Sequence, residues 1–166
     1  CIVMLTLSPE RINLHAPYRL VLSDSNVLRF ITDHGLVYEI GFTEDYTFME
    51  ENLYQFFISE LTGNHYAPDS KIKSTVWAVL EEFFQQNENV VIYICDTSDG
   101  RQHVRDCLFR IWFNSYSRKD DFELLHGDVE VDGKLYYASC LFSKESMYRE
   151  LVRNSFERFV IDFKEK

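Results

Sequence analysis

The sequence predicts an α+β fold, a mixed, mainly antiparallel sheet of about six or seven strands with three helices. The order of patterns is the first observation. Strand-like runs come first, then helix, strand and helix, and finally a hairpin and a closing helix. The second observation is length, since 166 residues suit one domain. The third is a hydrophobic fraction of 46%, enough for a core without disulfides or metals. We therefore expect residues 1–166 to form a single domain.

The chain is predicted to begin with an irregular leader, residues 1–16, followed by a β-meander. Tyr18 to Leu22 and Val27 to Ile31 are short alternating runs separated by turn-forming residues, and an Asp-His-Gly turn leads into Leu36 to Phe42. The apolar run Leu53 to Leu61 fits strand or helix, and its aromatic residues favour a strand.

A helix is predicted next, because Pro68, Asp69 and Ser70 form a start signal and apolar residues then recur at helical spacing. Val90 to Cys95 is too apolar to alternate, which indicates a central strand covered on both faces. The following helix is expected to begin at Ser98 or Asp99, both good N-caps.

The last third of the chain predicts a hairpin and a helix. The strands Phe122 to Val131 and Lys134 to Phe142 are joined by Asp-Gly, a strong hairpin turn, and His126 before a glycine suggests a bulge in the first of them. The closing helix carries Met147, Leu151, Val152, Phe156, Phe159, Val160 and Phe163 at helical spacing.

The charge distribution narrows the class of partner. The net charge is −10, and residues 1–68 hold 9 Asp and Glu against 3 Lys and Arg. An acidic protein repels phosphate backbones and anionic lipid surfaces, so we expect neither nucleic acid nor membrane as a partner. An acidic decoy for nucleic-acid-binding proteins is a further hypothesis, and it requires carboxylates clustered on one exposed face.

The four cysteines indicate a reduced, cytoplasmic protein. None has metal-finger spacing, and Cys95, Cys107 and Cys140 fall in apolar patterns typical of small buried side chains. We expect no metal and no cofactor. The amino terminus lacks the pattern of a signal peptide or a membrane span, and Met4 is interpreted as the true start, with lipidation of Cys1 as the alternative.

The segment Asp96 to Arg101 is the one place where a site can be argued locally, because ligands often bind where a buried strand leads into a helix. Asp96, Asp99 and His103 are the candidate catalytic residues, and Arg101 and Arg105 are the candidate contacts to an anion. The alternative is structural, since Asp and Ser also cap helices and form turns.

Two other arrangements are weaker. Asp99, His103 and Cys107 are four residues apart, so they lie in one row of a helix and could hold part of a metal site, although packing explains the last two. The remaining histidines fall in turns or at strand edges, and no complete catalytic or nucleotide-binding motif occurs.

Aromatic residues are unusually frequent, at 16% of the chain. Most must lie in the core, and we expect the rest at a partner surface or a pocket wall. The closing helix is the expected place, because Tyr148, Phe156, Phe159 and Phe163 form a wide apolar face. A homodimer built on this face is one hypothesis.

Three stretches resemble an uncharacterised bacterial family of about this length, known as a domain of unknown function. They are PYRLVLSDSNVLRFITDHGLVYEIGF, FFQQNENVVIYICDTSDGRQHVRDCLFRIWF and YYASCLF, within residues 17–142. The specific part is an apolar strand, an acidic turn, Arg105 and then Leu108, Phe109, Trp112 and Phe113. The resemblance implies a small, soluble bacterial protein and supplies no catalytic residues.

The sequence therefore favours a non-catalytic protein-interaction or regulatory domain, whose partner is another protein or a second copy of the chain. The alternative is a small enzyme, or an anion- or ligand-binding domain, that uses the turn Asp96 to Arg101. Whether the protein is an enzyme stays open at this point, with the absent motifs against it.

Overall fold

The computed structural model describes residues 3–63, 69–95 and 112–164. The strands are β1 (Val21–Leu22), β2 (Leu28–Ile31), β3 (Val37–Glu44), β4 (Leu53–Glu60), β5 (Val90–Cys95), β6 (Phe122–Val131) and β7 (Lys134–Ser143). The helices are α1 (Pro9–Ile12), α2 (Ser70–Phe83) and α4 (Arg149–Lys164), with a 3-10 turn η1 at Lys119–Asp121.

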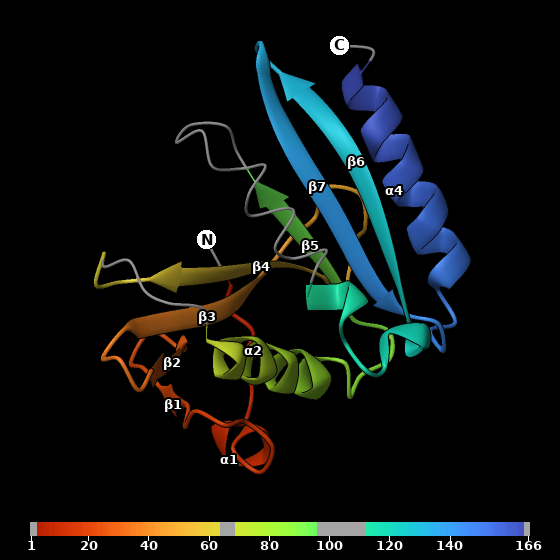
Figure 1. The fold of residues 1–166 in the computed structure, drawn as a ribbon. Coiled ribbons are helices and arrows are strands. Elements are labelled where there is room, and N and C mark those ends of the chain that lie inside the picture. The colour runs from red at the N-terminus through yellow and green to blue at the C-terminus, as the bar shows by residue number, and fades with distance from the viewer. Residues whose placement is uncertain (1–2, 64–68, 96–111, 165–166) are drawn as a thin grey trace. The chain divides into compact units, whose positions relative to one another are not determined.

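The strands form one open sheet in the order β1-β2-β3-β4-β5-β7-β6 (Figure 1). β4 and β5 are parallel, whereas β2 pairs antiparallel with β1 and β3, and β7 pairs antiparallel with β5 and β6. Parallel neighbours require a crossover connection, and the chain between β4 and β5 contains α2. The predicted α+β class with a mixed, mainly antiparallel sheet is confirmed.

The chain divides into two compact units. The first unit consists of Cys1–Glu44 and Phe56–Gln86, and the second unit of Asp45–Gln55 and Asn87–Lys166. The boundary between the units therefore falls twice near β4, once before it and once within it. The single domain expected over residues 1–166 stays a prediction.

In the first unit α2 packs against the meander through aromatic rings. The Phe42 ring of β3 stacks on Phe83 of α2 at 4.5 Å between centroids, and Phe30 stacks between Tyr18 and Tyr38. In the predicted run Leu36 to Phe42, the alternating residues Leu36, Tyr38, Ile40 and Phe42 are all buried. These contacts explain why a strand pattern with one apolar face ends up against an amphipathic helix.

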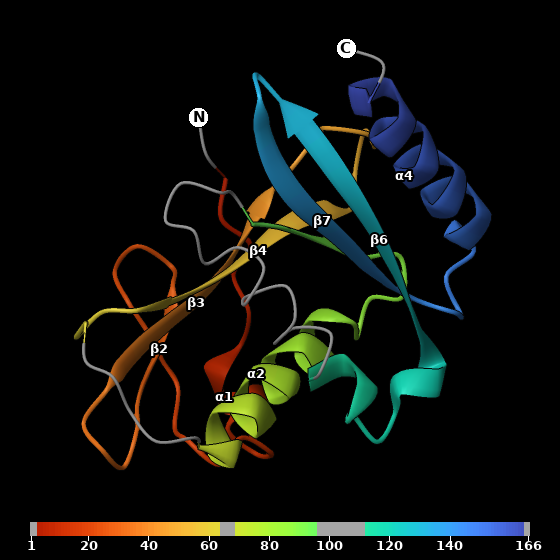
Figure 2. The same cartoon turned by 45° about the horizontal axis from the view of Figure 1, so that its top comes forward.

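The short helix α1 is not among the three predicted helices, so the predicted number differs slightly from the observed one. Ser8 caps it by accepting a hydrogen bond from the Arg11 N–H, and Pro9 occupies its first turn. Figure 2 shows α1 beside α2. α1 lies against α2, where the Arg11 Nε–Glu82 Oε1 distance is 3.2 Å. Four residues are too few to show helical periodicity in a sequence.

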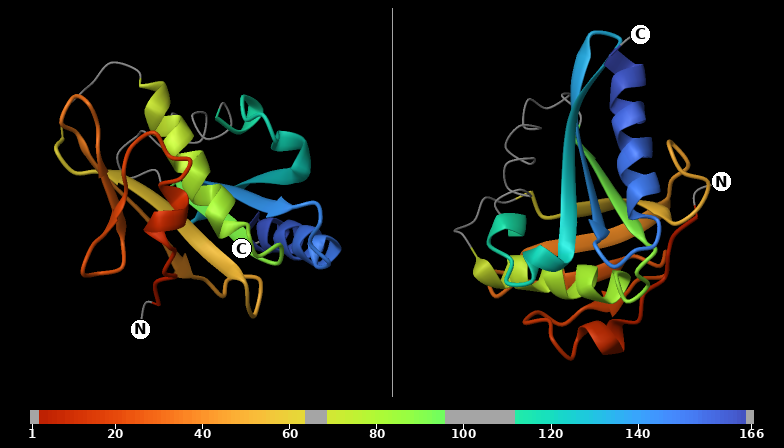
Figure 3. Two further views of the ribbon diagram at one scale, coloured as in Figure 1. Left: turned by 90° about the horizontal axis from the view of Figure 1, so that it is seen from below. Right: turned by 90° about the vertical axis from the view of Figure 1, so that its right-hand side faces the viewer.

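In the second unit β5 lies between the start of β4 and β7, and Val90, Val91 and Ile92 are fully buried. This confirms the central strand. β6 and β7 form a long hairpin whose turn residues, Asp132 and Gly133, have φ of 53° and 76°, as a type I′ turn requires. α4 runs along one face of this hairpin (Figure 3).

Two expectations about the second unit are wrong. β6 pairs with β7 residue by residue from Phe122↔Ser143 to Val131↔Lys134, so no bulge occurs at His126. Phe156 and Phe159 do not form an exposed face on α4, because both side chains are buried in the core of the second unit. The side chain of Phe163 lies outside the described residues.

The third predicted helix, beginning at Ser98 or Asp99, lies mostly outside the described residues. Within the described part, residues 112–114 are helical. Among the described residues, no helix is both long and apolar enough to cross a membrane.

Candidate functional site

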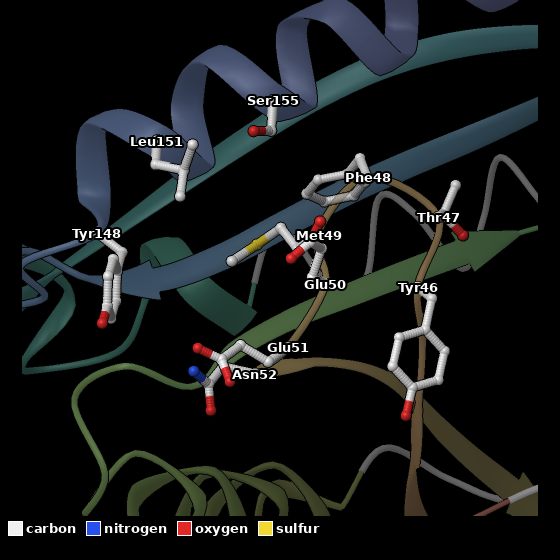
Figure 4. Close-up of a pocket in the computed structure, with 10 residues that line it drawn as sticks. All are labelled: Tyr46, Thr47, Phe48, Met49, Glu50, Glu51, Asn52, Tyr148, Leu151 and Ser155. Atoms are coloured by element: carbon white, nitrogen blue, oxygen red, sulfur yellow. The ribbon is translucent and has the colours of Figure 1, made fainter.

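The second unit contains an open groove with a volume of about 610 Å³ (Figure 4). One wall is the connection between β3 and β4, residues 46–52, and the other is the start of α4 with Tyr148, Leu151 and Ser155. We call this the α4 groove. Its volume falls within the range of about 300–1,000 Å³ typical of ligand sites.

Backbone hydrogen bonds fix the two ends of the connection. At its start the Asp45 N–H donates to the Leu53 carbonyl at 2.9 Å, and the Asp45 carboxylate accepts from the Thr47 N–H at 2.8 Å. At its end Asn52 takes a left-handed φ of 64°, and its carbonyl accepts from the Val90 N–H at 2.8 Å. Asn is among the residues that adopt this conformation most readily. The connection is thus held at both ends by the sheet.

Phe48 attaches the middle of the connection to α4. Its ring lies 5.8 Å from the Phe156 ring, edge to face, and 5.5 Å from the Phe159 ring. Met49 packs against the same core. Because Phe48 reaches into the core while its neighbours stay at the surface, the groove opens between the connection and the outer part of α4.

The spacing of the residues explains the wall that α4 forms. Leu151 and Ser155 are four residues apart, so they lie on one side of α4, and Tyr148 directly precedes the helix. Val152 and Phe156, one position further along in each case, face the core instead. The sequence therefore places a mixed apolar and hydroxyl surface beside the connection.

Two large side chains that line this groove are exposed. Tyr46 is 65% exposed and Leu151 is 56% exposed. Met147, which precedes the groove residue Tyr148 in sequence, is 77% exposed. Single exposed apolar residues are ordinary, but several near one hollow mark an interaction surface.

The groove is also acidic. Glu50 and Glu51 are exposed, and within the described part of the chain neither forms an ion pair or a hydrogen bond. On α4, the Arg153 side chain is 30% exposed and is already bound to Glu123 and Glu150. The groove thus combines apolar contact area with two available carboxylates.

The polar lining of the groove consists of carboxylate, amide and hydroxyl groups, among them Glu50, Glu51 and Ser155, and includes no Cys, His or Lys. In residues 3–63, 69–95 and 112–164, no group of three or more His, Cys, Asp or Glu side chains could hold a metal ion.

The sequence-predicted site residues Asp96, Asp99, Arg101, His103 and Arg105 lie outside the described residues, as does Cys107. They stay predictions. The described structure gives one relevant fact, that β5 ends directly before Asp96 and runs parallel to β4.

A histidine–serine pair occurs where the sequence showed no partner for the histidine. His126 and Ser139 are opposite each other in the β6–β7 register, and the His126 Nδ1–Ser139 Oγ distance is 2.9 Å. Ser139 is only 1% exposed, whereas a nucleophilic serine must be open to its substrate. We interpret the pair as satisfaction of a buried hydroxyl group.

Cys140 is fully buried, as its apolar pattern predicts, and burial raises the pKa of its thiol far above the ordinary value. A thiol held in its neutral form is a poor nucleophile. Of the cysteine side chains, the others lie outside the described residues.

Fold and site together define a class: a small α+β protein with an open sheet and an acidic, apolar surface groove. The family follows from comparison. Residues 68–158 match the model of Family of unknown function (DUF6169), which is more than half of the chain, so the chain belongs to this family. No curated protein and no solved structure matches the chain.

The match confirms the resemblance to an uncharacterised family. It includes α2, β5, β6, β7 and the first part of α4, with Tyr148, Leu151 and Ser155. The connection that forms the other wall of the groove precedes the matched residues, as does the meander. This connection has no periodic pattern that would predict a site in it, although its segment DYTFMEEN is dense in aromatic and acidic residues.

Proposed function

We propose that this protein is a non-catalytic protein-interaction domain, with a regulatory role in the bacterial cytoplasm, and that the α4 groove binds a segment of its partner. The observation that carries the proposal is the exposure of Tyr46 and Leu151 in the lining of one hollow of about 610 Å³. Interface centres are enriched in aromatic residues and Met, and a hollow lets a partner side chain become fully buried.

Burial of apolar side-chain area against the partner is the expected source of binding free energy. Burying an exposed Leu or Met side chain against a partner contributes about 1.5–3 kcal/mol relative to leaving it in water. Leu151 lines the groove and Met147 lies in the turn just before α4, and both are exposed. The groove is pre-formed, because Phe48 and the two ends of the connection are fixed by the core and the sheet. Pre-formed sites lose little conformational entropy on binding.

The test compares capture by matched variants. The tagged protein and its Leu151→Ala and Tyr46→Ser variants are expressed in the organism that carries the gene, beside Leu14→Ser as a control. Leu14 is 78% exposed, belongs to the first unit and is not among the residues that line the groove.

The proposal expects a protein captured by the wild type and by Leu14→Ser but not by the groove variants. It also expects the purified pair to form a complex of defined stoichiometry. A partner captured equally by all four proteins would contradict the groove as the binding site.

The alternative function is ligand binding or catalysis at Asp96 to Arg101. One observation favours it: β5 is a buried strand beside a parallel neighbour, and the carboxyl ends of parallel strands are common places for ligands. Its test is thermal unfolding with divalent ions and nucleotides. A ligand-induced rise in Tm that Asp96→Asn with Asp99→Asn abolishes, in a protein that stays folded, would favour this function.

A further inference from the structure

The proposed function does not specify the chemistry of the partner segment. The side chains that line the α4 groove indicate which chemistry it has. We infer that the partner segment is basic and apolar: it inserts a large apolar side chain between Phe48, Met49 and Leu151 and places Lys or Arg against Glu50 and Glu51. This inference rests on the proposed function, since it specifies what the same groove binds.

The inserted apolar side chain is inferred from the residues that line the groove. Figure 4 shows Met49 between Leu151 on α4 and the Glu51 and Asn52 end of the connection, with Phe48 beside Met49. Phe48 and Met49 are partly buried already, so their exposed surfaces form a floor rather than a protrusion. A floor of this kind accepts an inserted aliphatic or aromatic side chain, the usual anchor of an interface.

The Lys or Arg of the partner segment is inferred from charge complementarity with the groove. Glu50 and Glu51 form no ion pair within the described residues, and they are adjacent, so each raises the cost of the other's charge. A cation from a partner relieves this repulsion and gains attraction from both. Complementary charge also guides the encounter and excludes acidic partners.

Positive charge near the groove does not cancel this acidity. The start of α4 contributes about half a unit charge from the helix dipole, and Glu150 in the first turn lies where it offsets that charge. Arg153 is bound to Glu123 and Glu150, which offsets its charge. The Arg149 guanidinium donates to the Lys144 carbonyl at 3.2 Å and keeps its charge, but within the described residues it forms no ion pair with Glu50 or Glu51. The two groove carboxylates are therefore available to a cation of the partner.

The test uses a phage-displayed library of random 12-residue peptides selected on the purified full chain. The affinity of the enriched peptides is then measured for the wild type and for three variants. These are Glu50→Gln with Glu51→Gln, Leu151→Ala, and Asp128→Asn with Glu130→Gln. The last is the matched control, because it removes two exposed carboxylates of the same unit that do not line the groove.

We expect enriched peptides with Lys or Arg beside Leu, Phe or Trp. Their affinity should fall about threefold to tenfold in the Glu50→Gln, Glu51→Gln variant at low salt, with a smaller effect at high salt, as for exposed ion pairs. It should fall about tenfold or more in Leu151→Ala and stay unchanged in the control.

The contradicting outcomes are distinct. Peptides that need Leu151 but lack basic residues, or that bind equally to the Glu50→Gln, Glu51→Gln variant, would overturn the basic partner and leave the proposed function intact. A selection that yields no peptide dependent on Leu151 would overturn both.

Discussion

Gly127 shows how one residue fixes the position of α4 on the β6–β7 hairpin. A Cβ atom at this position would lie 2.4 Å from Val160 Cγ2, which is well inside van der Waals contact. Val160 cannot move away easily, because a β-branched side chain in a helix has one strongly preferred χ1 rotamer. The absence of a side chain at Gly127 therefore allows α4 to approach β6 closely.

We predict that Gly127→Ala lowers the free energy of unfolding by about 1–3 kcal/mol, the usual cost of overpacking. Urea unfolding measures it. In Gly127→Ala with Val160→Ala the space is restored, so the double variant should lose less than the sum of the two single changes. Additive losses would show that the two residues are not in contact.

The Asp33–Lys71 ion pair gives a prediction for pH. The Lys71 Nζ–Asp33 Oδ2 distance is 2.7 Å, and this hydrogen bond holds the pKa of Asp33 below its ordinary value. A carboxyl group with a depressed pKa stabilises the fold above its unfolded pKa of about 3.9. This contribution is lost as the pH falls through the lower, folded pKa.

The stability difference between the wild type and Asp33→Asn should therefore be present between pH 5 and pH 7 and disappear on acidification below about pH 4. Both side chains are at least half exposed, so the difference should be small and should decrease with added salt. Denaturant unfolding across this pH range measures it, with the exposed Asp24→Asn as control. A difference that grows at low pH would contradict the pairing.

At the scale of elements, one face of α4 packs in the core and another lines the groove. Phe156 is 2% exposed and packs in the core of the second unit, whereas Leu151 is 56% exposed in the groove. We predict that Phe156→Ala costs about 3–5 kcal/mol of unfolding free energy, whereas Leu151→Ala stays within about 0.5 kcal/mol. Thermal and urea unfolding of both variants decide this. Equal losses would contradict the orientation of α4.

Elements with strong patterns were predictable from sequence. The apolar run Val90 to Cys95 is β5 at its predicted bounds, and the Asp-Gly turn marks the β6–β7 hairpin correctly. Short or irregular parts were not predictable. α1 is one turn long, and the connection 46–52 takes its shape from Phe48 packing on α4, a contact between residues about 100 positions apart.

The orientation of the aromatic residues on α4 shows the same limit. A helical pattern shows that Phe156 and Phe159 share a face but not whether another part of the chain covers it. Phe48 and the hairpin cover that face, and the exposed apolar residue in the groove is Leu151 instead. The prediction that Phe156 and Phe159 form an exposed apolar face was thus wrong, and a partner surface on α4 stays a prediction.

At the scale of the whole molecule, charge determines which partners are disfavoured. With a net charge of −10, the protein repels phosphate backbones. We predict no binding to single- or double-stranded DNA or RNA at 50 mM salt, measured by fluorescence anisotropy with labelled oligonucleotides. Salt-sensitive binding at micromolar concentration would contradict this expectation and would point to a basic surface.

The central claim, a partner segment in the α4 groove, is tested most directly by photo-crosslinking. A benzoylphenylalanine at position 147 directly precedes the groove residue Tyr148 in sequence, and one at position 14 serves as control, since Met147 and Leu14 are 77% and 78% exposed. In cells of the source organism, position 147 should yield a crosslinked partner peptide that position 14 does not, and Leu151→Ala should remove it. No crosslink at 147, or the same products from both positions, would contradict the claim.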